Sequence, residues 1–369
     1  MKIAVVLGTR PEIIKMAPVI KELERRNADF FILHTGQHYS YGLDRVFFKQ
    51  LKLPQAKYNL EVGSGSHAEQ TANMLIGVER VLKGENPDIV LVEGDTNSVL
   101  SGALAASKLH IKVGHVEAGL RSYDRQMPEE LNRTLTDHCS DYLFAPTEKA
   151  RTILLSEGIP KEKIFVTGNT IADAVYLSLE RARERCDTLN LLGLNPKGYF
   201  LVTLHREENV DNPARFASIL IGLNKVFDEF HLPLIYPVHP RSRQRIEDFD
   251  LKLRNLTLID PIDFLGFLQL EDAARLILTD SGGVQEESCI LGVPCVTLRD
   301  NTERPETLEV GSNVLAGAIP ERILECTRMM LGREKNWMNP FGDGKAGERI
   351  VGIIMGENLT DMKVAQSMV

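Results

Sequence analysis

The sequence is poor in the residues that mark several classes of protein. Its five cysteines form no CxxC pair and are scattered along the chain, at Cys139, Cys186, Cys289, Cys295 and Cys326. Neither a disulfide framework nor a zinc site is indicated, and a reducing cytoplasm is the location that fits best. No apolar run reaches the roughly 18 residues that a membrane-spanning helix needs. The first apolar run, Ile3–Leu7, is also too short for the core of a signal peptide.

Positive charge is not in excess either. Asp and Glu number 51 against 43 Lys and Arg, which gives a formal net charge of −8. Such a chain has no overall positive field that would attract nucleic acid or an anionic membrane. We therefore expect neither as a partner, and any anionic ligand has to be held by a local cluster of cations.

Several familiar site motifs are missing. The sequence contains no GxxxxGK[ST], HExxH or GxSxG, so a P-loop hydrolase, a zinc protease and an α/β-hydrolase lose their main support. The histidines show no ligand spacing, and no metal site is predicted. Gly342, Gly344 and Gly347 match G-x-G-x-x-G, but they do not follow a strand. This context favours a loop that leads into a last helix from about Ala346.

The composition is that of a globular protein with about two domains. Hydrophobic residues make up 43% and charged residues 25% of the 369 positions. Short apolar runs alternate with segments of helical period, which predicts an α/β fold with parallel sheets. The predicted strands are Ile3–Leu7, Phe30–Leu33, Ile89–Val92, Val113–Val116, Tyr142–Ala145 and Ile164–Thr167, and then Tyr199–Leu204, Leu234–Val238, Leu256–Ile259, Leu276–Thr279 and Cys295–Leu298. Because the pattern restarts, we expect two doubly wound, Rossmann-like domains, 1–169 and 170–349.

Polar loops follow several of these strands. They are GTRPE at 8–12, EGDTNS at 93–98, HVEAGLR at 115–121, TLHREEN at 203–209 and TDSGGVQEE at 279–287. Ligands of open α/β sheets lie beyond the carboxyl ends of the strands, where these loops occur. We therefore expect a site in a cleft between the two domains.

One of these loops predicts an anion site. Ser281, Gly282 and Gly283 open a helix, whose free N–H groups and dipole favour a diphosphate. Glu286 and Glu287 strengthen the prediction, because a carboxylate one turn into such a helix can reach ribose hydroxyls. A simple tight turn with a helix cap is the alternative.

Four cations are candidates for binding phosphate. Arg10 and Lys15 lie in the first half, and Arg206 and Arg304 lie in the second half. Arginine suits bidentate phosphate contacts. Taken singly, each of them could equally be a solvated surface residue.

Three carboxylates and one histidine are candidates for proton transfer. Asp95, Glu117 and Glu129 lie at or beyond strand ends, where gathered carboxylates raise one another's pKa and serve as acid and base. A helix cap is the alternative for Asp95, and a favourable first-turn acid is the alternative for Glu129. His205 is the histidine that we expect to act, because it ends a strand beside polar residues. Lone histidines such as His115 are more often structural.

Together the motifs resemble the non-hydrolysing UDP-N-acetylglucosamine 2-epimerases. They occur in the order of that family: GTRPEIIK at 8–15, VEGDTNS at 92–98, HVEAGLRS at 115–122, PEELNR at 128–133, TLHREEN at 203–209, DSGGVQEE at 280–287 and RDNTERPET at 299–307. The resemblance runs from residue 3 to about 352. It implies the GT-B architecture, in which residues 350–369 would return as a helix to the first domain.

The family resemblance also implies an activity. Its members interconvert UDP-N-acetylglucosamine and UDP-N-acetylmannosamine without a nicotinamide or a metal. UDP is eliminated to leave 2-acetamidoglucal, and it then adds back with inversion at C2. A cytoplasmic homodimer is expected by the same likeness.

The matching motifs indicate which residues of this chain correspond to the site residues of the family. Asp95, Glu117, Glu129 and His205 would form the catalytic group. The substrate contacts would be Arg10, Lys15, Arg206, Ser281, Gly282, Gly283, Glu287 and Arg304. Gln37 and His38 match the start of a region in which many bacterial members bind a second UDP-N-acetylglucosamine as an activator.

Three rivals share the fold. A GT-B glycosyltransferase would pass the sugar to an acceptor, but no apolar or basic patch for a lipid-linked acceptor is evident. A hydrolysing epimerase would release free N-acetylmannosamine and UDP. A sugar-nucleotide sensor without chemistry would not need all three acidic positions.

Overall fold

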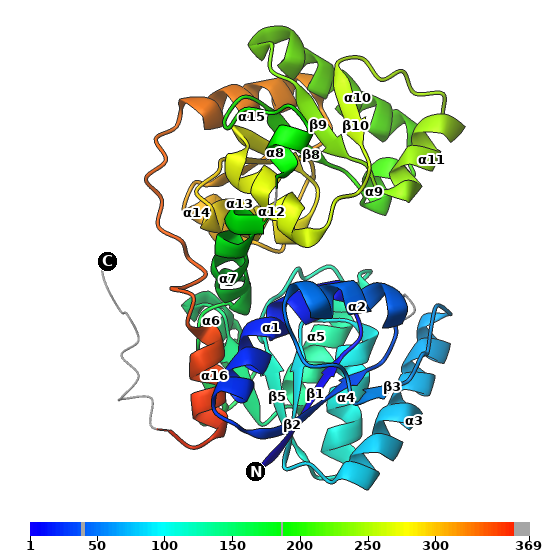
Figure 1. The fold of residues 1–369 in the computed structure, drawn as a ribbon, viewed down its shortest axis with the longest axis vertical. Helices are drawn as coiled ribbons and strands as arrows, with labels where there is room; N and C mark the ends of the chain where they lie inside the picture. The colour runs from blue at the N-terminus through cyan, green and yellow to red at the C-terminus, as the bar shows by residue number, and fades with distance from the viewer. Residues whose placement is uncertain (38–40, 186, 358–369) are drawn as a thin grey trace. The chain divides into compact units, whose positions relative to one another are not determined.

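The chain folds into two parallel-sheet units with helices packed on the sheets (Figure 1). The computed structural model describes residues 1–37, 41–185 and 187–357. The first unit contains Met1–Tyr176 and the described part of Phe341–Val369, and the second unit contains Leu177–Pro340. The division falls inside α7 (Thr170–Arg185), so this helix begins in the first unit and ends in the second.

A seven-stranded parallel sheet forms the centre of the first unit. Its strand order is β3-β2-β1-β4-β5-β6-β7. The strands are β1 (Lys2–Leu7), β2 (Asp29–His34), β3 (Tyr58–Asn59), β4 (Ile89–Glu93), β5 (Lys112–Val116), β6 (Tyr142–Ala145) and β7 (Ile164–Val166). Buried runs of Val, Ile and Leu are typical of parallel strands that are covered on both faces. The six predicted strands are confirmed, whereas β3 was missed because two residues carry no pattern.

The helices of the first unit follow their local sequence signals. They are α1 (Arg10–Arg25), α2 (Tyr41–Gln50), α3 (His67–Glu85), α4 (Asn97–Lys108), α5 (Pro128–Cys139), α6 (Glu148–Ser156), the 3-10 turn η1 (Lys161–Lys163) and α16 (Ala346–Ile354). Helix α3 begins with a capping box formed by Ser66 and Glu69. In α1, Pro11 stands in the first turn, and Ile13 and Ile20 are buried against the sheet.

The last described helix, α16, packs on α1 within the first unit. A Cβ atom on Gly347 would lie 2.9 Å from the carbonyl carbon of Pro18, so only glycine allows this approach. The carboxylate of Asp173 accepts hydrogen bonds from the Gly347 N–H at 2.9 Å and the Ala346 N–H at 3.1 Å. The glycine-rich stretch before α16 is therefore part of a structural loop, as its sequence context predicted.

The second unit repeats the arrangement with a six-stranded parallel sheet. Its order is β10-β9-β8-β11-β12-β13. The strands are β8 (Phe200–Thr203), β9 (Leu234–Pro237), β10 (Leu256–Ile259), β11 (Leu276–Thr279), β12 (Cys295–Thr297) and β13 (Asn313–Leu315). The helices are α8 (Thr188–Leu191), α9 (Glu207–Val210), α10 (Pro213–Phe230), α11 (Pro240–Asp248), α12 (Phe264–Ala273), α13 (Gly282–Ile290), α14 (Pro305–Glu309) and α15 (Pro320–Gly332). The five predicted strands are confirmed, and β13 was missed.

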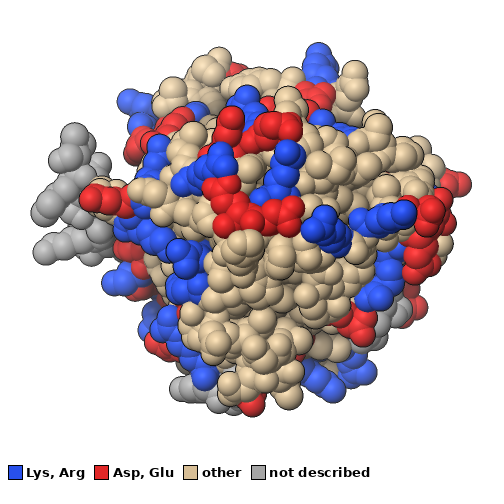
Figure 2. Space-filling model, turned by 90° about the horizontal axis from the view of Figure 1, so that it is seen from above, with Lys and Arg blue, Asp and Glu red and all other residues tan. Residues whose placement is uncertain are grey.

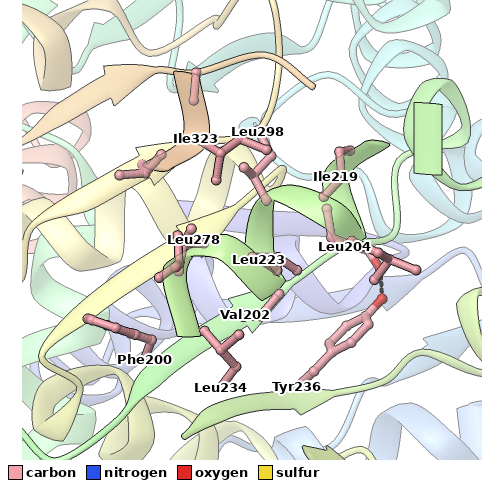
Figure 3. Close-up of a cluster of buried hydrophobic side chains, with 14 of the residues drawn as sticks. Phe200, Val202, Leu204, Ile219, Leu223, Leu234, Tyr236, Leu278, Leu298 and Ile323 are labelled. Atoms are coloured by element: carbon pink, nitrogen blue, oxygen red, sulfur yellow. Dashed lines mark hydrogen bonds between the residues drawn. The ribbon is translucent and has the colours of Figure 1, made fainter. Parts of the chain in front are cut away.

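One large apolar cluster holds α10 and α15 on the second sheet (Figure 3). Phe200 and Val202 come from β8, and Leu223 from α10 and Ile323 from α15 pack in the same cluster. The buried hydroxyl of Tyr236 donates to the Leu204 carbonyl at 2.5 Å, so this polar group of the cluster has a hydrogen-bond partner.

In both sheets the strand order reverses beside the first strand. The reversal lies between β1 and β4 in the first unit and between β8 and β11 in the second unit. Loops at such a point form the ligand site of open α/β sheets.

The surface charge and the hydropathy of the helices are those expected from the composition of the sequence. Blue and red side chains are interspersed over the face drawn in Figure 2, in line with the absence of an overall positive field. Among the described residues, no helix is long and apolar enough to cross a membrane.

Candidate active site

A buried cluster of two glutamates and a lysine lies at the carboxyl edge of the first sheet. Glu93 ends β4 and pairs in register with Val116, so Glu117 follows directly on the neighbouring strand β5. Lys15 reaches them from α1. Its Nζ lies 3.4 Å from Oε1 of Glu93 and donates to Oε2 of Glu117. The two carboxylate side chains are only 2% and 3% exposed.

The backbone of Glu117 is strained. Its φ of +68° lies in the left-handed region, which a non-glycine residue adopts only where its surroundings hold it there. Such strain concentrates at functional sites. The conformation directs a predicted catalytic carboxylate toward Lys15.

Glu12 joins the loops after β1 and β4. Its carboxylate accepts hydrogen bonds from the Gly8 and Thr9 N–H groups and from the Thr96 hydroxyl. The side chain is buried, and this burial raises the pKa of Glu12 to about 7, although the hydrogen bonds from Thr96 and Gly8 oppose the rise.

Asp95 is held by an arginine that the sequence reasoning missed. Arg133 on α5 donates to Asp95 and, at 2.6 Å, to Glu130. The side chain of Asp95 is 33% exposed. Thr96, not Asp95, caps α4, so the capping alternative for Asp95 is wrong.

Glu129 stands in the first turn of α5 and is half-buried. Its neighbour Glu130 is the buried acid of this turn, and it accepts hydrogen bonds from the backbones of Ser122 and Tyr123. The first-turn position that the sequence indicated for Glu129 is therefore observed.

The structural interpretation of His115 fits its surroundings. Nε2 of His115 lies 2.8 Å from the Gly94 carbonyl, and Nδ1 lies 2.7 Å from the buried Asp137 carboxylate. The same carboxylate accepts from the Gly119 N–H and pairs with Arg121. Asp137 thus fixes the loops that carry Asp95 and Glu117.

The remaining predicted residues of the first unit differ in burial. Arg10 begins α1, is exposed, and its guanidinium lies 5.6 Å from the centre of the Phe47 ring. Gln37 is buried, and its Oε1 accepts from the Ser98 N–H at 3.0 Å and the Ser98 hydroxyl at 2.8 Å. His38 lies outside the described residues.

The second unit supplies the predicted helix N-terminus. Ser281 is the N-cap of α13, and its Oγ accepts weakly from the Val284 N–H at 3.5 Å. Gly282 and Gly283 form the first turn. A Cβ atom on Gly282 would lie 2.5 Å from Oε1 of Glu303, whereas one on Gly283 would meet only Ser281 Oγ at 3.9 Å.

His205 is oriented by a buried aspartate. Its Nδ1 lies 3.0 Å from Oδ1 of Asp280, and its side chain is 46% exposed. Asp280 also accepts from the backbone N–H groups of His205 and Arg206 and from Asn209. Burial by itself raises the pKa of Asp280, but these partners outweigh burial and hold the pKa below its usual value. With Nδ1 held in this way, Nε2 is the ring nitrogen left to meet a ligand.

Arginines surround the start of α13. Arg206 lies 3.3 Å from Glu303, Arg299 donates to Glu303 at 2.8 Å, and Arg304 pairs with Glu286 at 2.8 Å. Burial alone raises the pKa of Glu303, but Arg304, Arg299 and Arg206 outweigh burial and lower the pKa to about 2. Glu303 is therefore an ionised carboxylate beside the predicted anion site.

Glu287 has a buried acidic neighbour. Glu271 on α12 is fully buried, and burial, the charge of Glu287 and a hydrogen bond with it raise the pKa of Glu271 well above its usual value. A proton on Glu271 leaves Glu287 as the carboxylate of the pair. Among the described residues, no group of three His, Cys, Asp or Glu side chains could hold a metal ion.

Known proteins resemble this chain over nearly its whole length. Residues 21–355 match the family described as UDP-N-acetylglucosamine 2-epimerase. A UDP-N-acetylglucosamine 2-epimerase of Methanocaldococcus jannaschii is 55% identical over 96% of this chain and 99% of its own. A UDP-2,3-diacetamido-2,3-dideoxy-D-glucuronate 2-epimerase of Pseudomonas aeruginosa is 43% identical, over 95% and 98% of the two chains.

The fold is shared with solved structures as well. A crystal structure of the M. jannaschii UDP-GlcNAc 2-epimerase in complex with UDP-GlcNAc and UDP superimposes with a TM-score of 0.90. It is 54% identical and covers 96% of this chain and 99% of that one. The two Rossmann-like sheets are accordingly those of the GT-B fold.

Proposed function

The chain belongs to the UDP-N-acetylglucosamine 2-epimerase family, and on this basis we propose that it interconverts UDP-N-acetylglucosamine and UDP-N-acetylmannosamine without hydrolysing them. The structural observation that carries the proposal is the buried Glu117 carboxylate on Lys15, at the carboxyl edge of the first sheet. It is a proton-transfer group held at the position where such folds act.

The chemistry of the substrate explains why carboxylates are needed. C2 of the sugar is not adjacent to a carbonyl carbon of the ring, so simple deprotonation would leave an unstabilised carbanion. In the proposed route a base takes H2 while the bond from C1 to the diphosphate oxygen breaks, and its electron pair leaves with UDP. The product pair is 2-acetamidoglucal and UDP. UDP then adds back to C1 as a proton reaches the opposite face of C2.

The first unit supplies the groups for this chemistry at the sugar. We assign proton transfer to Asp95, Glu117 and Glu129, with at least one of the three on each face of C2. Arg133 forms an ion pair with Asp95, and Lys15 forms one with Glu117. Arg10, exposed at the start of α1, is assigned to the sugar or phosphate side.

The second unit supplies the groups that bind UDP. Ser281, Gly282 and Gly283 bind the diphosphate at the start of α13, and Glu287 binds the ribose. The imidazole Nε2 of His205 contacts the departing phosphate or the sugar. Arg206 and Arg304 add positive charge, which stabilises the leaving diphosphate.

The family match disfavours the rival glycosyltransferase. A glycosyltransferase needs an acceptor, whereas an epimerase converts the sugar nucleotide alone. The P. aeruginosa relative acts, by its name, on a diacetamido-glucuronate, so this sugar nucleotide is the second substrate to assay.

The test is proton NMR of UDP-N-acetylglucosamine with the protein in deuterated water. We expect the manno isomer to appear with deuterium at C2 while UDP stays attached at equilibrium. Free N-acetylmannosamine and UDP would identify a hydrolysing enzyme. An unchanged sugar nucleotide, or a manno isomer without exchange at C2, would refute the proposal.

We further propose a cytoplasmic homodimer. Leu131 and Leu135 are one turn apart on α5 and exposed, as is Ile76 on α3, and each offers apolar surface to a second copy. Sedimentation velocity of the wild type against Leu131→Asp tests this assignment. A wild type that sediments as a monomer contradicts it.

Regulation by substrate is a separate proposal for Gln37 and His38. A hollow of about 260 Å³ lies beside the loop 62–65, and its lining includes Gln70, whose amide donates to the Gln37 carbonyl. We assign this region to a second UDP-N-acetylglucosamine. A hyperbolic dependence of rate on substrate in both directions would remove the assignment.

A further inference from the structure

We propose that Glu93 is a positioning residue whose buried carboxylate shares one proton with Glu117 and thereby makes Glu117 a stronger base toward C2 of the sugar. The proposal rests on the proposed function, because it concerns the proton that the epimerisation moves. Nothing in the sequence motifs had assigned a role to Glu93.

Geometry is the first support. Glu93 and Glu117 lie at the ends of neighbouring strands, and the ammonium of Lys15 contacts both carboxylates. Oε1 of Glu93 is 3.4 Å from this ammonium, and the carboxyl group of Glu93 also lies within hydrogen-bond reach of that of Glu117. Two carboxylates with one cation leave a net negative charge inside the protein, which a shared proton removes.

The surrounding charges act in the same direction. The charged groups that face Glu93 are Lys15 and Glu12 from α1 and Glu117 from the loop after β5. Burial raises the pKa of Glu93 well above its usual value; the charge of Lys15 opposes this rise, while Glu117 and Glu12 add to it. The proton of the pair is therefore lost at a much higher pH than that of an ordinary carboxyl group.

This behaviour suits the proposed reaction. H2 of the sugar is weakly acidic, and a base with a raised pKa removes such a proton faster than an ordinary carboxylate does. In the elimination the ionised pair takes H2, the C1–O electron pair leaves with UDP, and the proton is held between Glu93 and Glu117. In the reverse reaction the pair returns this proton to C2 as UDP adds to C1.

The experiment compares Glu93→Gln with the wild type. Glutamine keeps the size of the side chain and its ability to hydrogen-bond, but removes the like charge beside Glu117. The kcat–pH profile should then keep its shape, with the midpoint of its acidic limb about one to three pH units lower. We expect kcat on the plateau to fall about tenfold or more, because the base is weaker, and KM to stay within about threefold.

Two further variants separate this effect from a structural one. Glu93→Asp keeps the carboxylate and should retain most of the raised midpoint. Glu79→Gln makes the same chemical change on an exposed residue of α3 and should leave the profile unchanged. A Glu93→Gln enzyme whose midpoints equal those of the wild type, at any level of kcat, overturns the proposal.

A substrate-free measurement keeps this test distinct from the proposed function. Carboxyl carbons of 13C-glutamate are titrated by NMR in a Glu12→Gln, Glu271→Gln background, which removes two further buried glutamates whose pKa is raised by burial. One glutamate signal should still titrate well above the usual range of a glutamate carboxyl group. If none of them titrates above the usual range of a glutamate, the shared proton is refuted even in a fully active epimerase. If the signal is present but UDP-sugar is not converted, only the proposed function fails.

Discussion

Replacing Glu12 with glutamine removes a buried carboxyl group from the junction of two loops at the candidate site. Glu12 is 2% exposed and accepts hydrogen bonds from Gly8, Thr9 and Thr96. Glutamine can keep these bonds, because its oxygen accepts from the two backbone N–H groups and its amide donates to the threonine hydroxyl. The substitution therefore isolates the cost of burying the charge.

The size of the effect follows from linkage. Burial raises the pKa of Glu12 from 4.5 to about 7 in the folded protein. Below pH 4.5 Glu12 is protonated in both the folded and the unfolded protein, so its burial does not lower the free energy of unfolding. Between 4.5 and 7 only the unfolded state is ionised, so the free energy of unfolding falls by about 1.4 kcal/mol per pH unit. Above pH 7 the loss is complete, at about 3 kcal/mol. Glu12→Gln should match the wild type near pH 4.5 and exceed it by about 3 kcal/mol at pH 8.

The assay has to report on the first unit. The single tryptophan, Trp337, lies in the second unit, so its fluorescence does not follow this part of the chain. Hydrogen exchange of peptides from β1 and α1, measured by mass spectrometry from pH 5 to pH 8 after correction for intrinsic rates, gives the local unfolding free energy. Glu79→Gln is the exposed control and should show no difference that depends on pH. If the local free energy of unfolding differs between Glu12→Gln and the wild type by the same amount at every pH in this range, the predicted charge effect is refuted.

Two further predictions concern the second unit. Asp280→Asn should lower kcat by about tenfold to a hundredfold with little change in KM, because the fixed orientation of His205 is lost; a variant with unchanged steady-state kinetics contradicts this assignment. Gly282→Ala should lower stability by about 1–3 kcal/mol, because the added Cβ displaces Glu303. In Gly283→Ala the added Cβ meets only Ser281 Oγ at 3.9 Å, an ordinary contact distance, so the change should cost little. Thermal unfolding followed by tryptophan fluorescence compares the two alanine variants, and equal melting temperatures would count against the predicted clash.

The sequence was most informative about elements that depend only on a local pattern of residues. Eleven apolar runs predicted strands, and each of these strands is present. The strands that were missed, β3 and β13, are two and three residues long and carry no period. The start of α13 at Gly282 was likewise predictable from the sequence, because a serine followed by two glycines is typical of a helix N-terminus and depends on neighbouring residues alone.

The partners of the site residues were much less visible. Lys15 was expected to bind phosphate, but in the structure its ammonium lies between Glu93 and Glu117. Glu93 was predicted only as the first residue of the polar loop 93–98, with no role of its own. Arg133 and Asp137 lie in α5, the helix that begins with the motif of Glu129, and their roles depend on contacts with segments more than 15 residues away. Asp137 lay outside every motif, whereas Glu93 and Arg133 lay inside motifs that could have drawn attention to them.

The sequence by itself determined the alternation of strands and helices, the two Rossmann-like units and the family of the chain. These features follow from short-range periodicity and from motifs that can be read along the chain. The tertiary structure alone decided which carboxylates are buried together, which cation they share and which are held by hydrogen bonds. Protonation depends on burial and on charges within a few ångströms, and strand register and helix packing set those distances between residues that are far apart in sequence.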